Sequence, residues 1–178
     1  TGADRSKEGK FQVAGGGSLL LDEIDVLGGA EQAKLLRVIE NGEYEPVGSN
    51  ETLHSQARLI VASNVDLQTL AERNQFRMDL YYRLSVLEFN IPPLRMRPLD
   101  ICSLALEFVE ELCRAHDIHI QRVHPDFLDA LRNYEWPGNI RELRNIMERA
   151  AVLADSNEIG LRTIEYCLPG IADRAMET

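Results

Sequence analysis

Two adjacent carboxylates, Asp22 and Glu23, directly follow the apolar run Ser18–Leu21. Consecutive leucines between glycines predict a short strand that is buried on both faces, as in a parallel sheet covered by helices. The two charges must then emerge at the carboxyl end of the strand, where open α/β sheets bind ligands. A carboxylate there suits a Mg²⁺ ion that carries phosphates, and a second one can orient or deprotonate an attacking water. The alternative is a strand that ends in a solvated acidic turn.

Three further polar residues could take part in the same chemistry. The apolar segment Arg58–Ser63 predicts another buried strand, and it ends on Asn64. An asparagine at such a place is often only a turn residue. Arg77 and Arg83 lie six positions apart, and on an exposed helix such a pair is normally no more than solvated charge. Guanidinium groups can, however, stabilise the charge that spreads over transferring phosphoryl oxygens.

The segments around these residues predict an α/β arrangement. A helix is expected over Ala30–Asn41, because apolar residues recur there at helical spacing and Gly42 supplies a stop. Residues 43–47 and 52–56 predict a hairpin-like insertion. A third strand is expected over Val86–Ile91, since the two prolines that follow cannot continue a ladder.

Beyond these prolines the pattern becomes wholly helical. Apolar residues line one face of a helix that begins near Ile101, and Pro125 opens another helix at its first position. Asn139 is expected to cap a helix that Ile140 begins. Arg141 lies in the first turn of that helix, where its charge stands beside inward-facing N–H groups in a setting that favours an anion.

Composition and charge limit the classes of function. The formal charge is 19 − 29 = −10, which argues against the segment gripping a nucleic-acid backbone by itself. No apolar run approaches the roughly 20 residues of a membrane span, and no signal peptide is visible. The chain is therefore expected to be cytoplasmic and not to bind a membrane.

Four segments, taken in order, resemble motifs of the sigma-54-dependent transcription activators, a family of AAA+ ATPases. Phe11–Ile24 resembles the Walker B segment, Arg58–Asn64 sensor I, Phe76–Pro98 the segment of the arginine fingers, and Trp136–Asn145 sensor II. The departures are mild: Gly15 and Ser18 differ from the usual Walker B residues, and Ser63 replaces a more usual threonine.

The resemblance implies a role for each candidate residue. Asp22 would hold Mg²⁺ through water, Glu23 would activate the attacking water, and Asn64 would sense the γ-phosphate of ATP. Arg141 would contact the nucleotide phosphates of its own subunit, whereas Arg77 and Arg83 would reach the nucleotide of a neighbouring one. In this family ATP hydrolysis in a homo-oligomeric ring, usually a hexamer, remodels the sigma-54 RNA polymerase holoenzyme so that promoter DNA opens. DNA contact would need a separate helix-turn-helix module.

The start of the chain carries a partial motif. Thr1, Gly2 and Ala3 match the last three residues of the family's GAFTGA loop, which contacts sigma-54. No glycine-rich phosphate-binding loop occurs anywhere in the sequence. The resemblance therefore predicts the carboxyl-terminal portion of an ATPase domain, which by itself binds ATP weakly or not at all and is inactive.

The fold class implied is α/β: the latter part of a three-layer P-loop NTPase core over residues 1–93, a helical lid over 94–168 and a tail over 169–178. The family's strand order places a strand absent from this sequence between Leu59–Ser63 and Val86–Ile91, so an interrupted sheet with exposed edges is expected. Two other interpretations remain open. One is a non-catalytic interaction module with AAA+ shape, and the other is a different AAA+ machine such as a protease-associated unfoldase.

Overall fold

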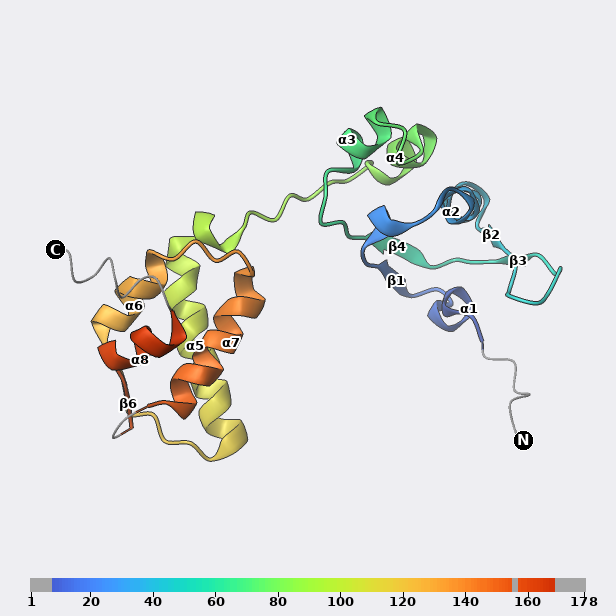
Figure 1. Ribbon diagram of the computed structural model, residues 1–178. Coiled ribbons are helices and arrows are strands. Elements are labelled where there is room, and N and C mark those ends of the chain that lie inside the picture. Colours follow the sequence, from blue (N-terminus) through green and yellow to red (C-terminus); the bar gives the residue numbers. More distant parts are fainter. Residues whose placement is uncertain (1–7, 155–156, 169–178) are drawn as a thin grey trace. The chain divides into compact units, whose positions relative to one another are not determined.

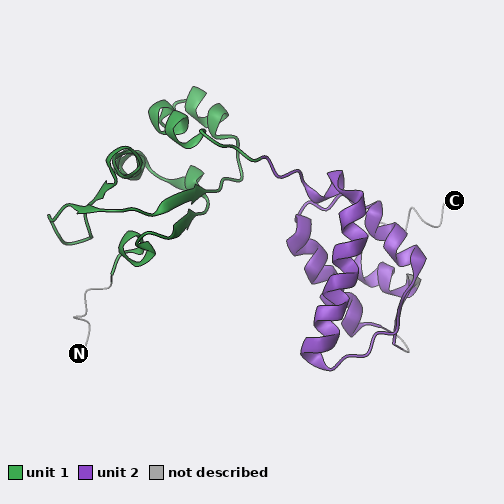
Figure 2. Cartoon of the chain, turned by 180° about the vertical axis from the view of Figure 1, so that it is seen from behind, with its two compact units in different colours: residues 1–89 green, residues 90–178 purple. Residues whose placement is uncertain are grey.

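The computed structural model describes residues 8–154 and 157–168 and divides the chain into two compact units, residues 1–89 and 90–178 (Figure 2). Thr1, Gly2, Ala3 and the predicted tail 169–178 lie outside the described residues. Within the described ranges, no helix combines the length and the hydropathy that crossing a membrane requires.

The first unit is built on a parallel pair of strands, β1 (Ser18–Leu21) and β4 (Arg58–Val61). Leu19 lies opposite Leu59 and Leu21 opposite Val61. The connection between the strands contains η1 (Ile24–Val26), α2 (Gly29–Asn41) and the antiparallel hairpin β2 (Glu43–Tyr44) and β3 (Leu53–His54) (Figure 1). The two predicted strands, the predicted helix and the hairpin-like insertion are thus confirmed, although each hairpin strand is only two residues long.

One face of the strand pair carries the core of this unit. Leu21, Leu59 and Val61 pack against residues of η1, of α2, of α3 (Leu67–Glu72) and of α4 (Met78–Leu84). The buried members of this cluster are Ile24, Leu35, Ala71, Phe76 and Leu80. The helices thereby fix the carboxyl ends of β1 and β4, which carry the candidate site.

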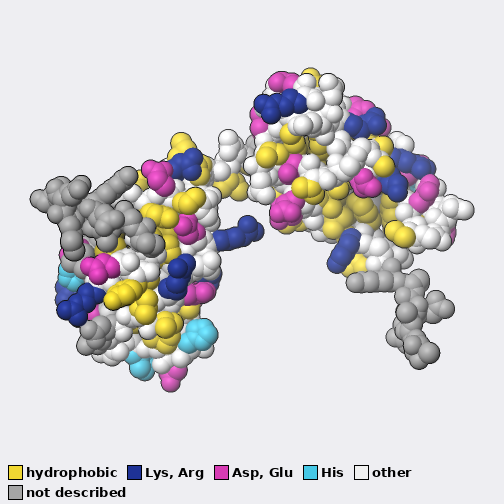
Figure 3. Space-filling view, in the orientation of Figure 1, with side chains coloured by type: hydrophobic (Ala, Val, Ile, Leu, Met, Phe, Trp, Pro, Cys, Tyr) yellow, Lys and Arg dark blue, Asp and Glu magenta, His cyan; other side chains and the backbone are white. Residues whose placement is uncertain are grey.

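The opposite face of the strand pair is open. Leu20 and Ile60, which are partners in the register, are 60% and 47% exposed. Hydrophobic side chains are visible on the surface of the molecule (Figure 3). The prediction of strands buried on both faces is therefore wrong. Side chains alternate between the faces of a strand, so Leu20 and Ile60 point away from the core on which Leu21, Leu59 and Val61 pack. The short helix α1 (Lys10–Ala14) contacts β1, and its Phe11 packs against that same core.

The prediction of a third strand over Val86–Ile91 is also wrong, because this segment has no regular secondary structure. Its apolar side chains Val86, Leu87, Phe89 and Ile91 are 66–85% exposed. A strand needs a ladder partner to satisfy its N–H and C=O groups, and among the described residues β1 and β4 pair only with each other. Without the third strand, the described strands β1 and β4 form a two-stranded parallel sheet and not the interrupted sheet that was expected.

The second unit is mainly helical. Its helices are α5 (Pro98–His116), α6 (Pro125–Arg132), α7 (Asn139–Val152) and α8 (Leu161–Cys167), and the single-turn helix η2 (Leu94–Met96) precedes them. Their apolar faces enclose a core that includes Phe127, Trp136 and Leu143, each 0% exposed. The helical pattern was predicted, whereas the two-residue parallel pair β5 (Arg122–Val123) and β6 (Glu158–Ile159) was not.

Asn139 does not cap α7 as predicted. The residue that precedes the helix is Gly138, and no side chain caps it. Asn139 has a left-handed backbone (φ +50°), and its Oδ1 accepts the backbone N–H of Leu94 at 2.8 Å. The short amide side chain therefore joins η2 to the start of α7, because its oxygen accepts the Leu94 N–H in place of an N–H of the helix.

Candidate functional site

The polar residues that follow β1 and β4 lie at the same edge of the strand pair. Pairing continues just past the strands, because the Ala62 N–H donates to the Leu21 carbonyl at 2.9 Å and the Ile24 N–H to the Ala62 carbonyl at 3.1 Å. Asp22 and Glu23 lie between the two bonded residues of the first strand, Leu21 and Ile24. Asn64 lies two residues after Ala62 on the other strand. The structure thus brings together three of the predicted site residues.

The turn at Asp22 and Glu23 is locally unusual. Glu23 has a left-handed backbone (φ +54°, ψ +44°), which residues other than glycine rarely adopt. Asp22 Oδ1 accepts the Glu23 N–H at 3.0 Å. The next side chain, that of Ile24, is buried in the core of the unit and holds the turn against it. Both carboxylates remain exposed, so the turn presents two acidic groups to solvent at the end of a strand.

A contact that the sequence did not reveal lies beside them. Ser63 Oγ is 2.9 Å from Asp25 Oδ1 and also 2.8 Å from the Val65 carbonyl, so its single proton serves one acceptor at a time. The charged carboxylate is the stronger acceptor. Ser63 therefore ties the end of β4 to the turn after β1, next to Asn64.

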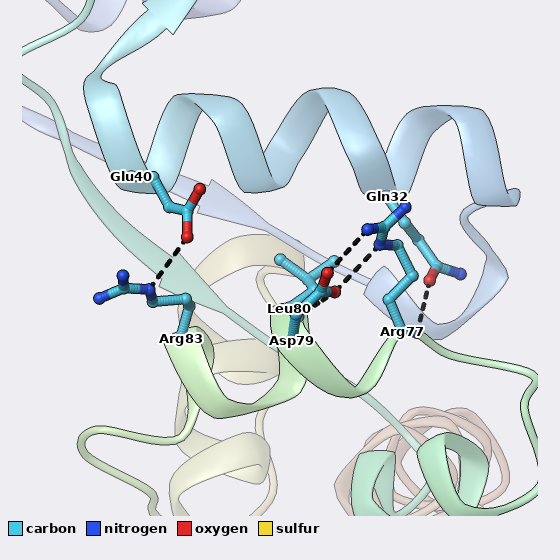
Figure 4. A network of polar contacts seen from close by, with 6 residues as sticks. All are labelled: Gln32, Glu40, Arg77, Asp79, Leu80 and Arg83. Atoms are coloured by element: carbon cyan, nitrogen blue, oxygen red, sulfur yellow. Dashed lines mark hydrogen bonds and ion pairs between the residues drawn. The ribbon is translucent and has the colours of Figure 1, made fainter.

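Arg77 and Arg83 come from the two ends of α4, on the side that faces α2 (Figure 4). Arg77 forms a two-point ion pair with Asp79, with Nε–Oδ1 at 3.0 Å and Nη2–Oδ2 at 2.7 Å. The hydrogen bond from Arg77 holds the pKa of Asp79 below its ordinary value. Arg83 Nε lies 3.3 Å from Glu40 Oε1 of α2, and both side chains are exposed. Each arginine thus has a carboxylate partner within its own unit.

The other candidate arginine lies in the second unit. Arg141 is exposed in the first turn of α7, and within the described residues no hydrogen bond or ion pair engages it. Arg144, one turn further, packs 4.2 Å above the ring of Phe108 and pairs with Glu111 at 2.9 Å. The two neighbouring arginines therefore differ: Arg144 holds helices together, whereas Arg141 points into solvent.

The start of α7 is already partly occupied by a carboxylate. Glu142 accepts the Gly138 N–H at 2.8 Å and the Tyr134 hydroxyl at 3.0 Å. The hydrogen bond to Glu142 raises the pKa of Tyr134. An anion bound by Arg141 would therefore find one of the N–H groups of this helix end already satisfied.

The chemistry of the donors at the strand edge suits one kind of cation. Nowhere in the described ranges do three or more His, Cys, Asp or Glu side chains gather into a ready-made metal cage. Mg²⁺ does not need one, because it keeps several waters and is commonly held by one or two carboxylates together with substrate phosphates. Asp22 and Glu23, two exposed oxygen donors side by side, fit Mg²⁺ in this manner.

Comparisons with known proteins agree on one family. The sequence profile of the Sigma-54 interaction domain matches residues 1–90, and that of the AAA+ ATPase lid domain matches residues 95–175. The Nif-specific regulatory protein of Rhizobium leguminosarum bv. trifolii is 47% identical over 159 residues, which cover 89% of this chain and 45% of that protein. The formate hydrogenlyase transcriptional activator FhlA of Escherichia coli K12 is 42% identical over 169 residues, covering 95% of this chain and 24% of that protein.

Solved structures give the same result. The structure of NtrX from Brucella abortus in complex with ATP superposes with a TM-score of 0.85 at 32% identity, covering 96% of this chain and 39% of that one. Its complex with ADP has the same TM-score at 31% identity, covering 97% of this chain and 39% of that one. The chain therefore spans less than half of each of these proteins, and the expected α/β fold with a helical lid is confirmed.

Proposed function

Because this chain belongs to the sigma-54 interaction domain family and carries its AAA+ ATPase lid, we propose that it forms part of an ATPase that remodels RNA polymerase bound to sigma-54. One relative, FhlA of Escherichia coli, is a transcriptional activator, which supports a role in transcription. Remodelling would open promoter DNA, and a separate helix-turn-helix module would select the DNA.

One observation carries this proposal: Asp22, Glu23 and Asn64 end two adjacent parallel strands at a common edge. In the proposed reaction Asp22 would hold Mg²⁺ through water, and Glu23 takes a proton from the water that attacks phosphorus. Asn64 donates or accepts a hydrogen bond beside that water. Mg²⁺, when bound with ATP, neutralises charge on the phosphate oxygens.

The arginines complete the proposed site. Arg141, exposed on α7, contacts the phosphates of its own subunit's nucleotide. Arg77 and Arg83 reach the nucleotide of the next subunit in a homo-oligomeric ring, which we propose is a hexamer. Their exposure at the two ends of α4 supports this role, since a planar guanidinium matches phosphate oxygens in two-point contacts.

ATP binding requires one part that the sequence does not contain. A glycine-rich loop supplies backbone N–H groups and a lysine to the phosphates, and no such loop occurs in these 178 residues. We therefore propose that the 178-residue chain alone binds ATP weakly and does not turn it over. Thr1, Gly2 and Ala3 are proposed to take part in the contact with sigma-54.

The deciding experiment is a titration with Mg²⁺ and ATP of this chain and of a version extended upstream through a phosphate loop. We expect tight binding and turnover only in the extended protein. If the extended protein binds no nucleotide, the ATPase proposal is wrong. The second candidate, a non-catalytic interaction module, is favoured by the missing phosphate loop, and it predicts that the extended protein still binds sigma-54 without ATP.

A further inference from the structure

The buried amide of Gln32 lies beneath the arginine-bearing helix α4. In the described part of the chain, the buried polar or charged side chains are Gln32 and Thr163, and Gln32 is only 3% exposed. It belongs to the first half of α2, one turn before the core residue Leu35. Burying an amide is costly unless both of its ends are hydrogen-bonded, so its partners explain why it is tolerated.

Both ends of the Gln32 amide have backbone partners. Its Oε1 accepts the N–H of Arg77 at 2.8 Å. Its Nε2 donates to the Leu27 carbonyl at 2.7 Å, and the Gln75 carbonyl lies at 3.5 Å. A backbone N–H can only donate and a carbonyl can only accept, so this orientation of the amide is fixed by its partners.

These bonds connect three segments of the first unit. Leu27 directly follows η1, the single turn that begins directly after Glu23. Arg77 is the residue that precedes α4, and its N–H has no helical acceptor because it stands at a helix start. Gln32 supplies that acceptor. The side chain of Arg77 is then aligned along the helix by Asp79 (Figure 4).

We propose that Gln32 is a positioning residue for the reaction, which holds the backbone of Arg77 in a set place relative to the turn that carries Glu23. This inference rests on the proposed function, in which Arg77 acts on the nucleotide of a neighbouring subunit. One amide therefore links the carboxylate turn of a subunit's own site to the arginine that the subunit offers to the next site.

Loss of this link should affect turnover more than binding. Gln32→Met keeps the length of the side chain but lacks both amide groups, and methionine adapts to an irregular core. With the Arg77 backbone free to shift, we expect kcat of the extended protein to fall about 10- to 100-fold, the usual effect of a misplacement near 1 Å. KM for ATP should stay within about twofold, because in the proposed reaction Arg77 stabilises the charge that develops on the phosphoryl oxygens in the transition state.

Mixed rings separate positioning of Arg77 from damage to the subunit's own site. Glu23→Gln subunits cannot activate water but keep Gln32 and Arg77. In an excess of them, each Gln32→Met subunit receives an intact arginine from its neighbour. We therefore expect turnover per Gln32→Met subunit to rise about tenfold, reversing part of the loss. Arg77→Ala subunits, mixed in the same way, provide the reference.

The outcomes distinguish the inference from the function on which it rests. Rescue of both Arg77→Ala and Gln32→Met supports the positioning role. Rescue of Arg77→Ala without rescue of Gln32→Met overturns it, since Gln32 then supports only its own subunit. If Arg77→Ala is not rescued, the proposed action between subunits fails and the inference fails with it.

Two controls guard against a trivial loss of folding. Gln121→Met makes the same change at an exposed position directly before β5 and should leave turnover unchanged. Ring assembly and melting temperature are measured for every variant. If Gln32→Met does not assemble, Gln32→Leu, which also lacks the amide, replaces it in the same mixtures and is judged by the same outcomes.

Discussion

The backbone N–H of Leu94 donates a 2.8 Å hydrogen bond to Asn139 Oδ1, and the two residues are 45 positions apart in the sequence. Leu94 is fully buried at the start of η2, and Asn139 begins α7 with a left-handed backbone. The bond therefore fixes the chain that enters the helical unit to the helix that carries Arg141.

Substitutions at Asn139 should separate the hydrogen bond from the backbone strain. Asn139→Gly loses the bond but accepts a positive φ, so the free energy of unfolding should fall by about 1 kcal/mol. Asn139→Ala loses the bond and adds left-handed strain, for a total of about 2 kcal/mol. Urea unfolding followed by fluorescence of Trp136 measures both. Equal losses for the two variants would show that the backbone of Asn139 is not strained.

Replacement of Glu23 should abolish turnover without unfolding the protein. The side chain is exposed, so Glu23→Gln should leave the melting temperature unchanged. Because a general base contributes about 10²- to 10⁴-fold to a rate, kcat of the extended protein should fall by at least about 100-fold. The matched control is Glu51→Gln, the same change at an exposed site in the β2–β3 connection, which should keep full turnover. A Glu23→Gln protein with more than a tenth of the parent's kcat would remove Glu23 from its proposed role.

The ion pair of Arg77 and Asp79 should be visible in the titration of the aspartate. The hydrogen bond from Arg77 lowers the pKa of Asp79 in the folded protein. The ion pair therefore contributes fully to stability above the pKa that Asp79 has in the unfolded chain, about 3.9. This contribution is lost as the pH falls through the lower pKa of Asp79 in the folded protein. Carboxyl NMR should find the midpoint of Asp79 below that of an ordinary aspartate.

Arg77→Met provides the comparison for that titration. Without the guanidinium, the pKa of Asp79 should rise toward its ordinary value. Asp66 serves as an internal control, since its pKa is lowered by the Thr69 hydroxyl and by backbone N–H groups. Its midpoint should be the same in both proteins. An unchanged Asp79 midpoint in Arg77→Met would mean that the ion pair does not form in solution.

Local patterns of residues were enough to predict β1, β4 and the β2–β3 hairpin, as well as the helices α2, α5, α6 and α7. Apolar runs predicted β1 and β4, Gly42 marked the end of α2, and Pro125 marked the start of α6. Each of these signals acts within a few residues of the chain. These signals locate single elements, whereas the P-loop NTPase core with a helical lid is implied by the resemblance of four segments to one family.

The errors concern features that depend on a distant partner. Whether Leu20 is buried depends on what covers that face of the strand pair, and whether Val86–Ile91 forms a strand depends on a neighbour with which to pair. The acceptors and donors of Gln32 and Asn139 lie up to 45 positions away. A polar residue on the inward face of an otherwise apolar helix stripe is the one signal that could have identified Gln32.

Arg141 and Arg144, two neighbouring arginines of α7, give the sharpest test of the proposed contact between Arg141 and the phosphates of ATP. Arg144 packs on Phe108 and pairs with Glu111, so Arg144→Met should lower the free energy of unfolding by about 1 kcal/mol. It should leave ATP affinity unchanged. Arg141 is exposed and engages none of the described residues, so Arg141→Met should not change stability.

In the extended protein, Arg141→Met should instead weaken ATP binding about tenfold, the loss of one charge-assisted contact to phosphate at about 1.4 kcal/mol. Measuring urea unfolding and ATP affinity on both variants gives a double comparison in which each protein controls for the other. If Arg144→Met weakened ATP binding as much as Arg141→Met, the effect would come from the packing of α7, and the proposed contact of Arg141 with phosphate would be wrong.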